Sequence, residues 1–162
     1  MGDPGRPPPL RQSVPNAVET MDRLSVLFLC THNSARSQMA EGLLRDRYGD
    51  RYEVYSAGVE ATEVRPLAIE VMREVGVDLT GHTSKRIDDL GDATFDVVVT
   101  VCDHAREACP HLPARRLNLH EGFEDPSAAS GSEEERRAVF RRVRDALADW
   151  IDDTFGEDPV RD

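Results

Sequence analysis

The segment Cys30-Thr-His-Asn-Ser-Ala-Arg36-Ser37 carries residue types that could bind an oxyanion and attack it. Cys30 ends an apolar run, and a helical pattern begins directly after the loop. At such a junction, successive backbone N–H groups can turn inward as an anion-binding nest, and the helix N-terminus adds its free amides. The guanidinium fork of Arg36 can grip two oxygens of a tetrahedral anion. We therefore predict that the substrate is bound by the loop residues Thr31, His32, Asn33, Ser34, Ala35 and Arg36.

The same environment should ionise the thiol of Cys30. A cysteine thiol has a pKa of about 8.5, but beside an arginine at a helix N-terminus this pKa falls to roughly 3.5–7.5. The Ser37 hydroxyl could donate a hydrogen bond that lowers the pKa of the thiol further. We expect Cys30 to be a thiolate at neutral pH and to act as a nucleophile. The alternative is a buried cysteine at a strand end, followed by an ordinary helix N-cap.

Two more cysteines accompany this loop. Cys102 also ends an apolar run, and parallel strands bring such ends to one sheet edge, so neighbouring strands about 4.8 Å apart would bring Cys102 near Cys30. Cys109 follows seven residues later. A helix would separate Cys102 from Cys109 by about 10.5 Å, whereas a disulfide needs Cα atoms within about 7 Å. The two could bond only if the segment unwound, which indicates a relay of thiols.

Asp125 lies in the loop Gly122-Phe-Glu-Asp125-Pro126, after the last predicted strand. An acid at that edge could protonate a departing oxygen. The alternative is a plain Asp-Pro turn.

The segment that holds Cys102 and Cys109 has an alternative interpretation as a zinc site, because Cys102, His104, Cys109 and His111 are possible ligands. Their spacing is not a familiar zinc-finger pattern, and we predict no metal site.

Seven elements position these residues. Apolar runs at 25–30 and 95–101 predict two buried strands, and two more short strands are predicted at 52–57 and 115–119. Periodic patterns at 37–48, 66–75 and 133–155 predict helices. The alternation predicts one α/β domain, with a four-stranded parallel sheet and helices on both faces. Such sheets bind ligands at the carboxyl ends of their strands. The domain should span residues 24–162, after a flexible proline-rich extension at 1–23 that holds five of the ten prolines.

The overall charge excludes some partners. The chain has 20 Lys and Arg against 31 Asp and Glu, a net charge of −11. Nucleic acids and anionic membranes bind positively charged protein surfaces, so neither is an expected partner of this acidic chain. No apolar run approaches the roughly 20 residues of a membrane span, and the start has no secretory signal pattern. We expect a cytoplasmic monomer that attracts an anion through a local site.

Four motifs together resemble the thioredoxin-coupled arsenate reductases, which share the fold of the low-molecular-weight protein tyrosine phosphatases. They are Cys30-Thr-His-Asn-Ser-Ala-Arg-Ser-Gln-Met-Ala-Glu41, Tyr55-Ser56-Ala-Gly58, the pair Cys102 and Cys109, and Asp125-Pro126. The resemblance covers about residues 24–153. It implies reduction of arsenate to arsenite, for arsenic detoxification, with thioredoxin as external reductant and no bound cofactor.

The resemblance also implies roles for individual residues. Cys30 would attack arsenate held by the loop amides and Arg36, while Asp125 protonates the leaving oxygen. Cys102 would then attack Cys30, release arsenite and leave a Cys30–Cys102 disulfide. Cys109 would next form a Cys102–Cys109 disulfide, which thioredoxin reduces.

One position departs from the pattern of this family. Some members bind potassium through residues that match Asn33, Glu41 and Ser56, together with an acid at the position of Lys85. We expect the Lys85 ammonium to take the place of the cation and to compensate Glu41. Activity should then respond alike to potassium and sodium.

Two other activities could use the same loop. Tyrosine phosphatases of this fold usually carry aromatic residues just after Asp-Pro, to sandwich the substrate ring, whereas Ser127-Ala-Ala-Ser-Gly follows here. An arsenate reductase that depends on a low-molecular-weight thiol needs only the first cysteine. The three cysteines of this chain therefore favour the internal relay.

Overall fold

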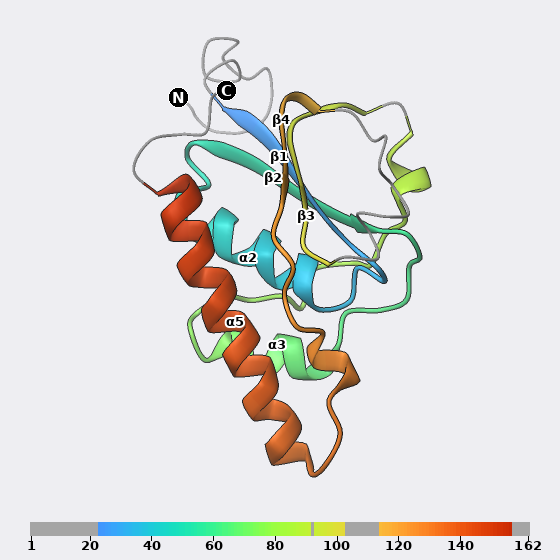
Figure 1. The fold of residues 1–162 in the computed structure, drawn as a ribbon, viewed down its shortest axis with the longest axis vertical. Helices are drawn as coiled ribbons and strands as arrows, with labels where there is room; N and C mark the ends of the chain where they lie inside the picture. The colour runs from blue at the N-terminus through green and yellow to red at the C-terminus, as the bar shows by residue number, and fades with distance from the viewer. Residues whose placement is uncertain (1–22, 92, 103–113, 157–162) are drawn as a thin grey trace.

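Four parallel strands form one sheet, as the sequence predicts, and the structure gives their order as β2-β1-β3-β4 (Figure 1). The computed structural model describes residues 23–91, 93–102 and 114–156. The strands are β1 (Leu24–Cys30), β2 (Tyr52–Gly58), β3 (Phe95–Thr100) and β4 (Ala114–His120).

The burial of each strand follows from its place in the sheet. All seven residues of the central strand β1 are buried, and five of the six in β3 are buried. Strands covered on both faces read as continuous apolar runs, which is why these two are the clearest in the sequence. β4 forms one edge, and most of its residues are partly or fully exposed. The chemistry-bearing segments that follow β1 and β3 therefore extend from the two most buried strands.

Three α-helices, α2 (Arg36–Tyr48), α3 (Pro66–Arg73) and α5 (Glu133–Phe155), gather on one side of the strands in Figure 1. α2 packs on β1 and β2, and α5 packs on α2 and α3. α3 ends two residues before its predicted end at residue 75, close to Gly76, whose φ of +83° suits glycine. Two single-turn 3₁₀ helices, η1 (Ile87–Leu90) and η2 (Pro126–Ala128), are too short to show a period in the sequence.

The strand order creates the binding edge. The chain passes from β1 to β2 on one side and then crosses to β3 on the other side of β1. At such a reversal, the loops that follow the two central strands diverge and leave a crevice. Cys30 ends β1 and Cys102 follows β3, so both thiols lie at this crevice.

Some predictions fall outside the described residues. These are the extension at 1–23, except its last residue, and the crossover between β3 and β4 that contains Cys109. Within the part of the chain that the structure describes, no helix is long and apolar enough to cross a membrane.

An aromatic cluster fixes the end of α5 to the sheet. Phe155 is fully buried, and its ring centroid lies 5.1 Å from that of Tyr52, 5.9 Å from Trp150 and 6.4 Å from Phe28, all in edge-to-face geometry. Such pairs add to the free energy that burial of a large ring contributes.

We predict that Phe155→Ala lowers the free energy of unfolding by about 3–5 kcal/mol, since it removes a buried ring and leaves a cavity. Phe155→Leu, the matched control, keeps most of the apolar volume and should cost less than half as much. Urea denaturation followed by circular dichroism measures both. A loss below about 1 kcal/mol for the alanine variant would show that this cluster does not anchor the helix.

Candidate active site

The carbonyl groups of the loop after β1 are held from outside by the surrounding scaffold. Five successive carbonyl oxygens accept hydrogen bonds: Cys30 from Val59 N (3.2 Å), Thr31 from Glu60 N (2.9 Å), His32 from Ser84 Oγ (2.9 Å), Asn33 from Gln38 Nε2 (3.1 Å) and Ser34 from Arg65 N (2.9 Å). Because these carbonyls face outward, the amides between them turn toward the inside of the loop. Within the described ranges, the N–H groups of Asn33, Ser34 and Ala35 have no protein acceptor. This is the form of an anion-binding nest.

Asn33 sets the curvature of the loop. It is the one non-glycine residue with positive φ (+50°) among those described, and its side chain is fully buried. Its amide nitrogen donates to Ser37 Oγ (2.8 Å) and Ser56 Oγ (3.0 Å), and its oxygen accepts from Gln38 Nε2 (2.9 Å) and Lys85 N (2.8 Å). With every donor and acceptor of the amide engaged, the left-handed backbone is firmly held.

Gly58, at the end of β2, allows the loop to approach the neighbouring strand. A Cβ atom built at this position would lie 2.7 Å from the backbone nitrogen of Asn33 and 2.9 Å from the carbonyl carbon of His32. Any side chain would push the loop away, so the glycine is required by close approach and not by its φ angle.

The expected role of Lys85 is wrong. Its ammonium donates to the carbonyl of Thr83 (2.9 Å) on the surface. Glu41 is instead compensated by Arg45, whose Nη2 lies 2.5 Å from Glu41 Oε2, while Ser56 Oγ donates to Glu41 Oε1 (2.5 Å). Arg45 lies one helical turn after Glu41, and this local i,i+4 pair takes the role that was expected of Lys85.

The residues around Glu41 also do not fit a monovalent cation. Both carboxylate oxygens of Glu41 are bound, and the Asn33 oxygen already accepts two hydrogen bonds. Among the described residues, no group of three or more His, Cys, Asp or Glu could hold a metal ion. Of the four zinc ligands considered above, only Cys102 is a described residue.

Cys30 is 2% exposed, yet its surroundings favour the thiolate. A hydrogen bond from the side chain of Cys102 lowers the pKa of Cys30 most. Burial acts in the opposite direction, and the charge of Arg36 and the backbone N–H groups of Ser37 and His32 add to the lowering. The net result is a pKa well below that of an ordinary thiol. Ser37 thus acts on Cys30 through its amide, while its hydroxyl oxygen accepts from Asn33.

Cys102 lies beside Cys30 because β1 and β3 are hydrogen-bonded neighbours in register Leu29 with Thr100. Cys102 is 4% exposed, and its sulfur is 3.2 Å from Thr31 Oγ1. The first residue of the loop therefore holds the second thiol, an interaction that sequence spacing does not reveal. Cys109 is outside the described residues.

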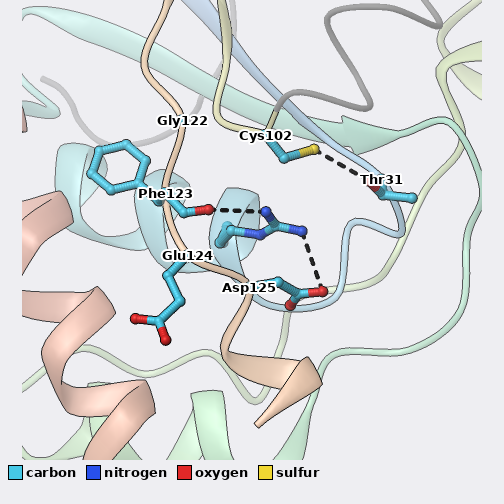
Figure 2. A pocket seen from close by; sticks show the side chains of 7 residues that line it. Thr31, Cys102, Gly122, Phe123, Glu124 and Asp125 are labelled. Carbon is cyan, nitrogen blue, oxygen red and sulfur yellow. Dashed lines mark hydrogen bonds and ion pairs between the residues drawn. The ribbon is translucent and has the colours of Figure 1, made fainter.

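A cleft of about 550 Å³ opens over these groups (Figure 2). Its lining residues are Thr31, Arg36, Cys102, Gly122, Phe123, Glu124 and Asp125. Arg36 Nη1 donates to the carbonyl of Phe123 (3.1 Å), and its Nη2 lies 3.6 Å from Asp125 Oδ2. The Nε of Arg36 is buried without a hydrogen-bond partner in the described part of the chain. A buried unpaired donor at a nest is a free contact for an anion.

Asp125 faces the cleft from the loop after β4. It caps η2, since its Oδ1 accepts from Ser127 N (3.0 Å), and its side chain is 41% exposed. The structure thus brings the predicted site residues that it describes to one edge of the sheet. These are Cys30 to Ser37, Cys102 and Asp125. His32 is the outermost of them, with its ring turned to Glu60 (3.5 Å).

Residues that support the loop were not predicted as functional. Gln38 and Arg45 lie on α2 and read as ordinary helix positions, so their roles depend on contacts with distant segments. For Gln38, the available signal was a polar residue in the first turn of a helix, directly before the apolar Met39 and Ala40.

Comparison with known proteins places this geometry in a family. Residues 25–158 match the family described as low molecular weight phosphotyrosine protein phosphatase. Arsenate reductase of Halalkalibacterium halodurans is 47% identical over 137 residues, which cover 85% of this chain and 98% of that protein. Arsenate reductase of Bacillus subtilis is 46% identical over 131 residues, or 81% of this chain and 94% of that protein.

Solved structures agree with these matches. An arsenate reductase in the oxidized state has a TM-score of 0.68 and 33% identity, and the match covers 80% of this chain and 94% of that one. A low molecular weight protein tyrosine phosphatase from T. tengcongensis has a TM-score of 0.64 and 28% identity, with 80% and 95% coverage. The chain therefore belongs to the low molecular weight phosphotyrosine protein phosphatase family, and its close relatives include arsenate reductases.

Proposed function

We propose that this protein reduces arsenate to arsenite, by attack of Cys30 on the bound oxyanion and a disulfide relay through Cys102 and Cys109. One observation supports this above all. A buried thiol with a lowered pKa lies within an anion nest, and a second buried thiol is hydrogen-bonded to it. Hydrolysis of an ester needs only the first thiol, whereas reduction needs a second thiol, from the chain or from solution, to attack the sulfur bound to arsenic, and here a second thiol of the chain lies beside the first.

In the first step, the Cys30 thiolate attacks the arsenic(V) centre. The loop amides and Arg36 hold the other oxygens, where they stabilise the charge of the transition state. An S–As bond forms and one As–O bond breaks. Asp125 passes its proton to the departing oxygen, which leaves as water. Asp125 lines the cleft beside Arg36, so its carboxyl group is within reach of a bound anion.

In the second step, the Cys102 thiolate attacks the sulfur of Cys30. The S–As bond breaks and its electron pair stays on arsenic, which becomes arsenic(III) and leaves as arsenite. A Cys30–Cys102 disulfide forms, so two thiols are oxidised as arsenic is reduced. The hydroxyl of Thr31, 3.2 Å from the Cys102 sulfur, can donate to the thiolate and favour its formation.

In the third step, Cys109 attacks Cys102 and releases Cys30 as a thiolate. The Cys102–Cys109 disulfide is then reduced by an external dithiol, for which we propose thioredoxin, with no bound cofactor. The two electrons and two protons of the dithiol balance the cycle. Such a cycle requires thiols that are reduced at rest, as in the cytoplasm. We expect the protein to act there as a monomer, on the free anion.

A phosphatase activity would use the same nest. The cleft, however, offers no ring for stacking on an aryl substrate. Phe123 is the one aromatic residue among those that line the described cleft, and its ring packs on Trp150 at 6.2 Å. Small phosphate esters can still reach Cys30, so we expect only weak hydrolysis of such esters.

We predict that the rate of Cys30 alkylation reaches its plateau below neutral pH, because the lowered pKa makes the thiolate the main form there. Cys102→Ala removes the hydrogen bond that lowers this pKa most, so the inflection should move to higher pH. Cys102→Ser keeps a donor and should move it less. Alkylation with iodoacetamide across pH, quantified at Cys30 by peptide mass spectrometry, measures this. An inflection near pH 8.5 in the unaltered protein would refute the first step.

We predict that Cys30→Ser, Cys102→Ser and Cys109→Ser each reduce thioredoxin-coupled arsenate turnover by roughly 10³-fold or more, because each removes a member of one relay. The point of arrest should differ. Cys109→Ser should release a single equivalent of arsenite and stop with a Cys30–Cys102 disulfide, which mass spectrometry detects. Cys102→Ser should release none.

The phosphatase alternative predicts the opposite pattern. Hydrolysis of p-nitrophenyl phosphate would then exceed arsenate reduction, and Cys102→Ser would keep the main activity. If Cys109→Ser keeps full turnover with thioredoxin, the last step of the relay is wrong. If it keeps turnover only with glutathione, a low-molecular-weight thiol is the reductant.

A further inference from the structure

Two carboxylates line the cleft that receives the proposed anion, in a chain whose net charge is −11. Asp125 has a role, since Arg36 faces it and η2 depends on it as a cap. Glu124 has none in the proposed reaction. A carboxylate at this place would repel an oxyanion, because charges a few ångströms apart interact by about 1 kcal/mol or more even in a watery site.

Glu124 is held away from the anion site by Arg142 of α5. Arg142 Nη2 lies 2.8 Å from both carboxylate oxygens, and its Nε is 3.2 Å from Oε1. Figure 2 shows the Glu124 side chain pointing toward this helix, on the opposite side of the loop from Cys102. Asp125, the next residue, points to the cleft.

Arg142 differs from the neighbouring arginines of α5. Arg137, Arg141 and Arg144 pair with acidic residues of α3, of its C-cap Glu74 or of α5 itself. Arg142 reaches the loop of the cleft instead. Its side chain is 62% exposed and that of Glu124 is 51% exposed, so the pair contributes little to stability. The pair should therefore matter for where the Glu124 carboxylate lies relative to the cleft.

We propose that Arg142 is a positioning residue that keeps the Glu124 carboxylate turned out of the cleft and neutralised, and thereby sets the affinity for the oxyanion. Without Arg142, the exposed Glu124 side chain would be free to rotate toward the mouth of the cleft. The inference rests on the proposed oxyanion substrate, but it concerns capture of the anion and not the chemistry of the thiols.

Binding of inorganic phosphate tests the proposal without any turnover. Phosphate that occupies the nest slows the alkylation of Cys30, and the concentration for half-protection gives its Kd. We expect Arg142→Gln to weaken phosphate binding roughly three- to ten-fold at low salt, and less at 0.5 M NaCl, where the charge is screened. KM for arsenate should rise by a similar factor, with kcat little changed.

The double variant separates a positioned charge from a general loss of positive charge. Glu124→Gln alone should bind phosphate as tightly as the unaltered protein or more tightly, and Glu124→Gln with Arg142→Gln should restore its affinity. Arg141→Gln, the matched control, removes the same charge from the same helix but faces Glu74, and should change the Kd less than two-fold.

Two outcomes would overturn the proposal. One is an Arg142→Gln variant that binds phosphate as Arg141→Gln does, and the other is a double variant as weak as Arg142→Gln alone. Failure of arsenate reduction with the expected phosphate affinities would instead refute the proposed function and leave this inference intact.

Discussion

The site depends on one constraint, that five successive carbonyl groups of the loop after β1 are hydrogen-bonded to the scaffold outside it. The donors come from the segment after β2, from α2, from the residue before α3 and from the chain near Ser84. A peptide unit whose carbonyl is held on one side must present its N–H to the other side. The fold therefore aims the loop amides at Cys30 before any anion arrives, and binding requires little rearrangement.

This arrangement explains how an acidic protein can hold a buried anionic sulfur and attract an anionic substrate. Desolvation raises the pKa of Cys30, and the net charge of the chain opposes anion capture. A few short-range contacts of Cys30 and the loop outweigh both effects. The Cys102 side chain and two backbone amides act on Cys30 through hydrogen bonds and Arg36 acts through its charge, at a thiol that is only 2% exposed. Local donors thus decide the charge state of the site, whereas the distant acids are screened.

The same contacts give the two central strands distinct chemical roles. β1 delivers the thiol of Cys30, our proposed nucleophile, into the nest, and β3 delivers a second thiol to its side. The loop after β4 closes the cleft with an acid and with the carbonyl that accepts from Arg36. Among the described residues that line the cleft, the one aromatic ring is that of Phe123, which packs on Trp150, and this suits a small inorganic oxyanion better than an aryl ester. Because each group comes from a different strand end, the spacing between them is set by the sheet.

Much of this could be read from the sequence, because it depends on local pattern. Continuous apolar runs identified the buried strands, and the segment Cys30 to Ser37 between a strand and a helix identified the nest. Parallel topology then implied that Cys102 would lie near Cys30. Contacts between distant segments could not be predicted in this way. Thr31 contacts Cys102, and Arg142 binds Glu124. Each of these pairs is chosen among several residues of suitable charge or polarity by how helices and loops pack, and composition and spacing leave that choice open.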